Sequence, residues 1–179
     1  MEIERKFIPK YLPDHLEDYS YHEIEQGYLC TNPTIRIRKM DDSYFLTYKG
    51  SGMMAHEEHE MPLTQEAYLH LRKKTDGMLI TKRRYLIPFQ AKDAASAPAP
   101  AHTQVPSAAS YTIELDLFRE ALDGITLAEV EFSSIEEAES FIPPDWFGED
   151  VTYDGRYHNS AMSRGSLTGP SEHETPDRF

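Results

Sequence analysis

Charged residues occupy every second position in several short segments of this chain and include both carboxylates and cations. Six segments follow this spacing, and Lys82-Arg83-Arg84 keeps it with a charged residue in the middle. The carboxylates are Glu2, Glu4, Glu58, Glu60, Glu114, Asp116, Glu129 and Glu131. The cations are Lys6, Arg36, Arg38, Lys49, Lys82 and Arg84. Carboxylate oxygens bind hard divalent cations, and Arg and Lys bind anions, so the set suits a polyanion bound together with a divalent metal.

The spacing predicts β-strands that place each charged pair on one face. Successive side chains of a strand point to opposite faces, so the residue between two charges lies on the other face. A single segment of this kind is ordinarily a solvated face, but seven in one small chain indicate one shared charged surface. Closing the sheet would gather that surface into a polar bore, with helices covering the apolar outer face.

Eight strands are expected, and several of them follow one another with short connections. Asp41-Asp42 predicts a hairpin connection, and Gly50-Ser51-Gly52 predicts a turn between the next two strands. These neighbouring strands should therefore be antiparallel. The expected strands span Glu2–Pro9, Tyr21–Leu29, Thr34–Met40, Ser43–Gly50, Met53–Met61, Met78–Pro88, Tyr111–Phe118 and Thr126–Ser133.

Two helices are predicted to form the outer cover. Thr64 is a candidate N-cap for a helix that runs to about Asp76. Ser134 and Glu137 have the spacing of a capping box, which predicts a second helix that stops before Pro143-Pro144. The fold class is therefore a β-dominated α+β fold, a closed eight-stranded antiparallel β-barrel with a charged interior and helices packed outside.

The length and the local composition predict one domain with one insertion. A chain of 179 residues can bury one good core, and we expect a single domain over residues 1–163. Residues 90–110 are rich in Ala, Ser and Pro and are expected to form a flexible loop between two paired strands. Residues 164–179 are similarly polar and are expected to form a loose tail.

Charge and cysteine content exclude several classes of partner. A net charge of −13 argues against general binding of nucleic acid or acidic membranes, since both rely on a basic surface. No apolar run approaches the roughly 20 residues of a membrane span, and no signal peptide is visible. Cys30 is the only cysteine, which excludes internal disulfides and fits a reducing cytoplasm. We therefore expect a cytoplasmic protein, a monomer or a homodimer, whose anionic ligand is small and locally held.

Several segments of the chain carry a resemblance to a known family. The opening Glu2-Ile3-Glu4-Arg5-Lys6-Phe7 matches the ExExK signature of the CYTH superfamily, also called triphosphate tunnel metalloenzymes, and the later charged pairs match in order. Further segments resemble the compact bacterial members: residues 24–29, 127–132, 143–149 and 151–160. The resemblance covers nearly everything up to about Ser163 except the Ala/Pro-rich insertion, and it implies an eight-stranded tunnel, in agreement with the predicted bore.

The resemblance also implies roles for individual residues. The metal ligands for Mg²⁺ or Mn²⁺ would be Glu2, Glu4, Glu129 and Glu131. The triphosphate would be held by Lys6, Arg36, Arg38, Lys49, Lys82 and Arg84, with Arg156 near the tunnel mouth. Lys6 would also position the terminal phosphoryl group or its attacking water. The segment Tyr157–Ser163 is expected to be a helix that closes one end.

Four carboxylates are left with open roles. Glu58, Glu60, Glu114 and Asp116 could bind a second metal, orient a water, or pair with basic residues and hold them in place. At least one of them is expected near the nucleophile, so they are candidate catalytic residues together with Lys6.

The resemblance implies metal-dependent hydrolysis of a linear triphosphate, with inorganic tripolyphosphate as the leading substrate and ATP as a further one. A class IV-type adenylate cyclase would bind ATP in the same kind of tunnel, and a thiamine triphosphatase would use the same site. A non-catalytic polyphosphate or nucleotide sensor, which would bind without turnover, is the alternative from another class.

Overall fold

The computed structural model describes residues 2–50, 55–90 and 110–167, and within these ranges the chain is dominated by β-strands. The strands are β1 (Glu2–Pro9), β2 (Tyr21–Thr31), β3 (Thr34–Met40), β4 (Ser43–Lys49), β5 (Ala55–His56), β6 (Glu58–Pro62), β7 (Asp76–Gln90), β8 (Ser110–Phe118), β9 (Thr126–Glu131) and β10 (Phe147–Asp150). The helices are α1 (Gln65–Arg72), α2 (Ile135–Ser140) and α3 (Asn159–Met162), with 3-10 turns at Leu16–Asp18, Glu120–Leu122 and Gly155–Tyr157.

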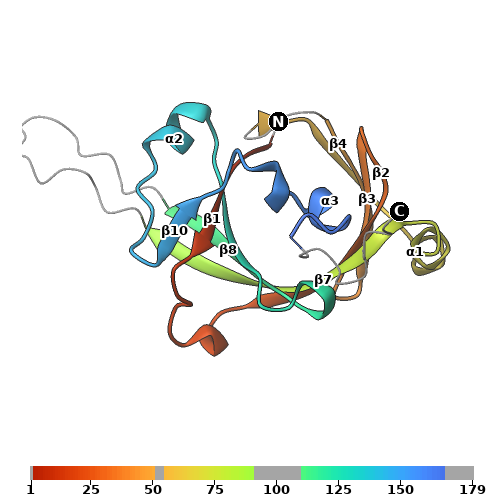
Figure 1. Ribbon diagram of the computed structural model, residues 1–179, viewed down its shortest axis with the longest axis horizontal. Helices are drawn as coiled ribbons and strands as arrows, with labels where there is room; N and C mark the ends of the chain where they lie inside the picture. The colour runs from red at the N-terminus through yellow and green to blue at the C-terminus, as the bar shows by residue number, and fades with distance from the viewer. Residues whose placement is uncertain (1, 51–54, 91–109, 168–179) are drawn as a thin grey trace, which may run out of the picture.

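The strands form one strongly curved antiparallel sheet. Its order is β10-β1-β9-β8-β7-β2-β3-β4-β6, and every neighbouring pair is antiparallel. The sheet curls until β6 and β4 come round to face β1, and α3 lies inside the curve (Figure 1). The β-dominated α+β class and the antiparallel arrangement are therefore confirmed.

The prediction of a closed eight-stranded barrel is wrong in two respects. The hydrogen-bonded path contains nine strands, because the short β10 pairs with β1 at Phe7 and Pro9. The path also ends at β6, which pairs with β4 and forms no ladder with β1. The expected fifth strand is interrupted at Glu57, whose carbonyl accepts from the amide of Gly50 at 2.8 Å. In the described part of this segment, the two-residue β5 pairs with β1, through the register pairs Glu2–His56 and Ile3–Ala55.

The two longer helices lie outside the sheet, as predicted. The Thr64 side chain caps α1, accepting from the amide of Ala67 at 3.2 Å, and α1 ends at Arg72, earlier than expected. The Ser134 side chain caps α2, accepting from the amide of Glu137 at 3.1 Å. Helix α1 packs on β3 and β4, and α2 packs on β1.

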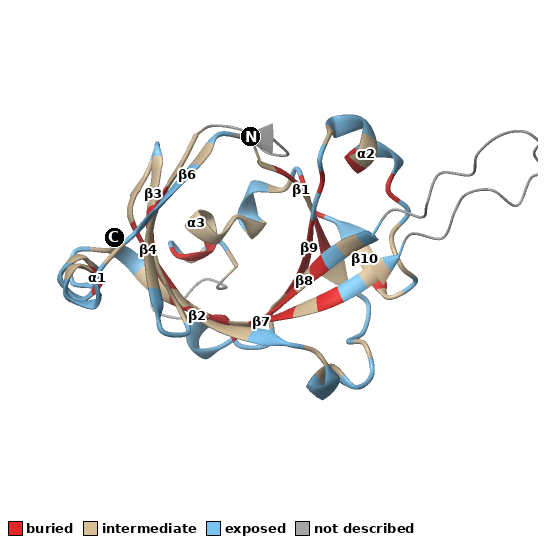
Figure 2. Ribbon diagram, turned by 180° about the vertical axis from the view of Figure 1, so that it is seen from behind, coloured by how far each residue is buried: buried red, intermediate tan, exposed pale blue. Residues whose placement is uncertain are grey.

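The convex face of the sheet carries the main core. Its members lie on the opposite strand parity from the charged pairs, for example Ile3 and Phe7 on β1 and Val130 on β9. Ala138 of α2 and the following Phe141 complete this cluster. The buried strand residues of this cluster lie on β1, β7, β8, β9 and β10 (Figure 2).

A second apolar cluster lies on the concave face, at one end of the strands. Its strand members share the parity of the charged residues and lie beyond them along the strand, as Phe118 follows Asp116 on β8 and Leu127 precedes Glu129 on β9. Met162 of α3 packs into this cluster. The predicted short helix after residue 157 is thus present, and it fills one end of the curved sheet from within.

The Ala/Pro-rich insertion and most of the expected tail lie outside the described residues. The β7–β8 ladder runs up to both ends of the insertion, with Gln90 opposite Ser110. None of the helices in the described part of the chain is long and apolar enough to cross a membrane.

Candidate active site

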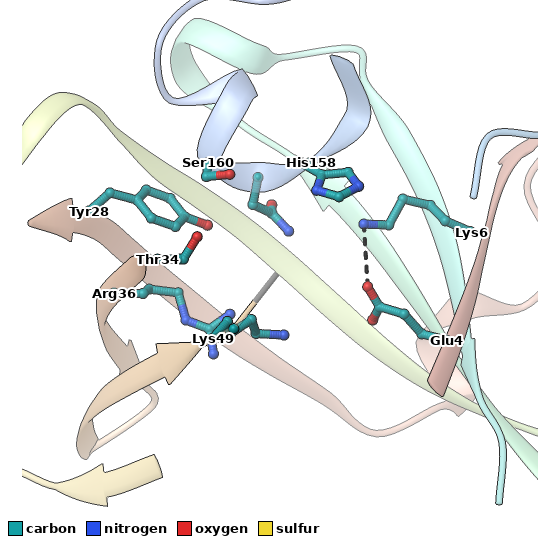
Figure 3. A pocket seen from close by; sticks show the side chains of 10 residues that line it. Glu4, Lys6, Tyr28, Thr34, Arg36, Lys49, His158 and Ser160 are labelled. Carbon is teal, nitrogen blue, oxygen red and sulfur yellow. Dashed lines mark ion pairs between the residues drawn. The ribbon is translucent and has the colours of Figure 1, made fainter. Parts of the chain in front are cut away.

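A small cavity opens on the concave face between β1, β3, β4 and the segment leading into α3 (Figure 3). Its lining is polar and carries both signs of charge. The lining residues are Glu4, Lys6, Tyr28, Thr34, Arg36, Lys49, Gly50, His158, Asn159 and Ser160. The alternation of each strand explains the arrangement, since the charged parity of β1, β3 and β4 faces inward.

Lys6 connects the cavity to the carboxylates of β1 and β9. Its Nζ lies 2.8 Å from Glu129 and 3.9 Å from Glu4. Lys6 and Glu129 are direct cross-strand neighbours in the β1–β9 register. Burial alone would lower the pKa of Lys6, but Glu129 and Glu4 outweigh it and raise that pKa above its usual value. Lys6 is therefore a fixed positive charge beside the cavity.

A buried ion network lies behind these residues. Asp116, which is 0% exposed, accepts from Lys82 Nζ at 2.5 Å and from Arg84 at 2.6 and 2.7 Å. Arg84 also reaches Glu129 at 2.6 Å and pairs with Glu114. Burial and the neighbouring Arg84 lower the pKa of Lys82 to about 8, although Asp116 opposes that shift. Asp116 thus holds two of the predicted phosphate-binding cations in place.

Arg36 and Arg38 form the cationic side of the concave face. Arg36 donates to Thr47 Oγ1 at 3.1 Å and lies 3.6 Å from Glu58. Arg38 has no ion pair with any described residue, and the Nε atoms of both arginines are buried without a partner there. Burial, Arg36 and Arg84 lower the pKa of Arg38 to about 10. This excess of positive charge would be relieved by a bound anion.

Lys49 connects β1 with β6. Its Nζ lies 2.7 Å from Glu2 on β1 and 2.5 Å from Glu58 on β6. Burial and a hydrogen bond with Glu2 raise the pKa of Glu58. Glu60 accepts from Thr47 Oγ1 at 3.2 Å, so that threonine links Glu60 to Arg36.

The predicted metal ligands are brought to one region, with different surroundings. Glu4 and Glu131 face each other directly across the β1–β9 ladder, which is unfavourable for two like charges unless a cation lies near them. Burial and the carboxylates of Glu2, Glu114 and Glu4 raise the pKa of Glu131. Glu2 and Glu129 are engaged by lysine and arginine side chains.

Within the described ranges, no three His, Cys, Asp or Glu side chains are arranged to hold a metal ion by themselves. The register pair Glu4 and Glu131 offers the carboxylate oxygens that Mg²⁺ prefers, and such an ion would keep several waters and take further ligands from substrate phosphates.

Arg156 is separate from the other predicted residues. Its side chain is 66% exposed and pairs with Asp154 at 2.6 Å, and it does not line the cavity. Five further residues line the cavity: Tyr28, Thr34, His158, Asn159 and Ser160. They lie outside the alternating acidic and basic pairs, so the charge pattern of the sequence did not indicate them.

Comparison with known proteins identifies relatives over most of the chain. The chain is 35% identical over 166 residues to an inorganic triphosphatase of Nitrosomonas europaea, covering 90% of this chain and 96% of the relative. It is 29% identical to an inorganic triphosphatase of Acetivibrio thermocellus, covering 90% and 92%. A crystal structure of the inorganic triphosphatase NE1496 matches with a TM-score of 0.61 at 33% identity, covering 92% of this chain and 95% of that chain.

No family model matches the chain. The relatives nevertheless extend over nearly its whole length, and the solved structure shares its curved antiparallel sheet. The chain therefore belongs to the inorganic triphosphatase family, within the CYTH superfamily.

Proposed function

We propose that this protein hydrolyses inorganic tripolyphosphate to diphosphate and phosphate with the help of Mg²⁺ or Mn²⁺. The observation that carries the proposal is the separation of charge on the concave face. Arg36 and Arg38 lie on β3 with little compensation, whereas Glu4 and Glu131 face each other across β1 and β9. A polyanion bound with a divalent cation would neutralise both sides at once.

The cations of the site would bind the phosphate chain in different ways. Arg36 and Arg38 offer forked donors, and their Nε atoms are buried without partners among the described residues. Lys6 and Lys49 add compact charges at the cavity wall. Because Asp116 fixes Lys82 and Arg84 from behind, these two cations would add a preorganised positive field.

Glu4 and Glu131 would hold the metal ion, with Glu2 and Glu129 nearby. The ion would polarise phosphate oxygens and stabilise the charge that develops during attack by water. Lys6 would orient the terminal phosphoryl group, since it is held between Glu129 and Glu4 at the cavity wall. Glu58, Glu60 and Glu114 remain the candidates for orienting the attacking water, whereas Asp116 is a positioning residue.

The test is phosphate release from tripolyphosphate and from ATP in parallel, with Mg²⁺, with Mn²⁺ and with chelator. Metal-dependent release with tripolyphosphate preferred is the expected result. Cyclic AMP and diphosphate from ATP would instead make the protein a cyclase, and binding without turnover would make it a sensor.

A matched pair of arginine variants locates the reaction on the concave face. Arg36→Gln removes a cation from the cavity, whereas Arg83→Gln removes one from the other parity of the sheet, where it pairs with Glu23. Loss of one charged hydrogen bond predicts roughly a 10- to 100-fold lower kcat/KM for Arg36→Gln. Arg83→Gln should leave kcat/KM unchanged, and equal losses in both variants would contradict the placement of the site.

A further inference from the structure

Thr152 joins β1 to the segment that leads into α3, at the residue of β1 that carries the cavity lysine. Thr152 is 5% exposed, and its Oγ1 accepts from the backbone amide of Lys6 at 3.0 Å. The amide of the preceding Val151 donates to the carbonyl oxygen of Lys6 at 2.9 Å. Both polar backbone groups of Lys6 are therefore held by one short segment after β10.

These two hydrogen bonds begin where the ladder between β1 and β10 ends. The register pairs of that ladder are Phe7–Asp150 and Pro9–Phe147, with an irregularity between them. Asp150 is the last residue of β10. A buried backbone amide needs an acceptor, and the hydroxyl of Thr152 supplies one for Lys6 where the chain leaves the sheet.

Asp150 determines the direction of the Thr152 hydroxyl. Its Oδ1 accepts from Thr152 Oγ1 at 2.5 Å and from the backbone amide of Thr152 at 3.0 Å. Because the hydroxyl proton points to this carboxylate, the lone pairs of Oγ1 remain for the amide of Lys6. Burial would raise the pKa of Asp150, but hydrogen bonds from Thr152 and Arg5 outweigh it and lower that pKa. Asp150 is therefore an ionised acceptor at neutral pH.

Arg5 anchors this carboxylate on the convex side of the sheet. Arg5 and Lys6 are neighbours on β1, so their side chains lie on opposite faces. The Nη2 of Arg5 donates to Asp150 Oδ2 at 2.5 Å, and its Nη1 donates to the carbonyl oxygen of Ala138 at 2.9 Å. The hydrogen bonds thus form a closed circuit from the side chain of Arg5 through Asp150 and Thr152 to the backbone of Lys6.

The segment that contains Thr152 also contributes to the wall of the cavity. It continues through the 3-10 turn Gly155–Tyr157 into α3, which lies inside the curved sheet (Figure 1). His158, Asn159 and Ser160 line the cavity together with Lys6 (Figure 3). The bond between Thr152 and Lys6 therefore connects two parts of the cavity wall that are far apart in the sequence.

We propose that Thr152 is a positioning residue, which holds β1 so that the ammonium group of Lys6 meets the terminal phosphoryl group, and that Asp150 orients its hydroxyl. This inference rests on the proposed function, in which Lys6 orients that phosphoryl group. The ammonium lies between Glu129 and Glu4, so a shift of the Lys6 backbone would change its distances to both carboxylates and to the substrate. A displacement of about 1 Å in an active site can lower a rate about 100-fold.

The experiment measures kcat and KM for phosphate release from tripolyphosphate with Mg²⁺. Thr152→Val keeps the branched shape and removes the hydroxyl, whereas Thr152→Ser keeps the hydroxyl. We expect roughly 10- to 100-fold lower kcat for Thr152→Val with a much smaller change in KM, and nearly wild-type kcat for Thr152→Ser. Thr152→Ala, which also lacks the hydroxyl and cannot crowd its neighbours, is the second variant for the same comparison.

Thr64→Val is the matched control. The Thr64 hydroxyl also accepts from a backbone amide, that of Ala67 at 3.2 Å, but it caps α1 outside the sheet. Thr64→Val should therefore lower the melting temperature and leave kcat unchanged.

A double-mutant cycle tests whether Thr152 acts through Lys6. In the Lys6→Ala background, Thr152→Val should have no further effect on the rate, because no ammonium group is left to position. Single-turnover assays with excess protein measure the slow rates of these variants. Equal fold losses in both backgrounds would mean that Thr152 has a merely structural role, which would overturn the inference.

A second cycle tests the role of Asp150. Asp150→Ala should lower kcat less than Thr152→Val, and the double variant should have the kcat of Thr152→Val, because Asp150 acts through the hydroxyl. Additive effects would overturn the part of Asp150 in the proposal.

The outcomes separate the two proposals. Wild-type kcat in the folded Thr152→Val and Thr152→Ala variants would overturn this inference and leave the proposed function standing. Absence of phosphate release by the wild-type protein would overturn both. Hydrogen exchange at the Lys6 amide gives a readout without turnover: it should be faster in Thr152→Val, and an unchanged rate would contradict the inference. Thermal unfolding of each variant establishes that it is folded before the assay.

Discussion

Replacing Asp116 by asparagine should destabilise the protein strongly, because one carboxylate neutralises two buried cations. Lys82 is 1% exposed and Asp116 is 0% exposed, and their charged atoms are 2.5 Å apart. Arg84 contacts the same carboxylate at 2.6 Å. An asparagine keeps the shape of the side chain but offers no charge to either cation.

The expected cost follows from which partners remain. Removing one member of a buried ion pair typically costs about 3–5 kcal/mol, because the other charge stays buried and uncompensated. Arg84 keeps Glu129 and Glu114, so the loss falls mainly on Lys82. The pKa of Lys82 is already lowered to about 8, and without Asp116 it would fall further. Deprotonation of Lys82 then limits the cost, and we expect about 3 kcal/mol at neutral pH.

Urea unfolding followed by circular dichroism at pH 6.5 and pH 9 measures this effect. The destabilisation should be larger at pH 6.5, where the protonated Lys82 of the wild-type protein is stabilised by Asp116, and smaller at pH 9, where Lys82 has largely lost its proton in both proteins. Asp154→Asn is the matched control, because Asp154 pairs with the exposed Arg156 and solvent screens such surface pairs, so that they contribute little to stability. An Asp116→Asn variant within about 1 kcal/mol of wild type at both pH values would refute the reasoning.

Three further predictions concern the site, the pH response and the insertion. Lys6→Ala should retain the fold but reduce phosphate release from tripolyphosphate by a large factor; a wild-type rate would remove Lys6 from the mechanism. The pKa of Lys82 is about 8 in the folded protein and 10.5 in the unfolded chain, so the unfolded state binds more protons between these pH values. The free energy of unfolding should therefore increase as the pH rises through that window. Comparing urea unfolding of wild type and Lys82→Met over pH 8–10.5 measures this gain, and identical pH profiles would contradict it. Deleting residues 94–106 should leave activity and melting temperature nearly unchanged, since the β7–β8 ladder closes at Gln90 and Ser110, and a large fall in melting temperature would show that the insertion packs.

The alternation of charged residues predicted which side chains lie on the concave face, because the face on which a strand residue lies is set locally, by its position along the strand. Glu4, Lys6, Arg36 and Lys49 share one face through the two-residue period of their strands, and the register then brings them together. The caps at Thr64 and Ser134 were likewise readable, since each depends on residues three positions apart.

Other features depend on distant pairing that no local pattern encodes. The interruption at Glu57 and the short β10 follow from how segments meet across the sheet. The apolar residues that fill one end, such as Phe118 and Leu127, continue the charged parity and become interior only once the sheet curves. Tyr28 was missed for a different reason, because a neutral residue on that face carries no charge signal.

The seam, where β1 lies next to β5 and β6, is held together more by ion pairs than by backbone pairing. Among the residues that the structure describes, the two register pairs with β5 are the only ladder at this seam, and Lys49 contacts both Glu2 and Glu58 there. The sheet should therefore open locally at the seam more readily than elsewhere. We expect backbone amides beside the seam to exchange with solvent faster than those of the continuous β7–β8 ladder. An anion that draws Lys49 away from Glu2 would loosen the seam, and loosening the seam would in turn strengthen the hold of Lys49 on that anion. The stability of the seam and the binding of an anion in the cavity therefore depend on the same lysine.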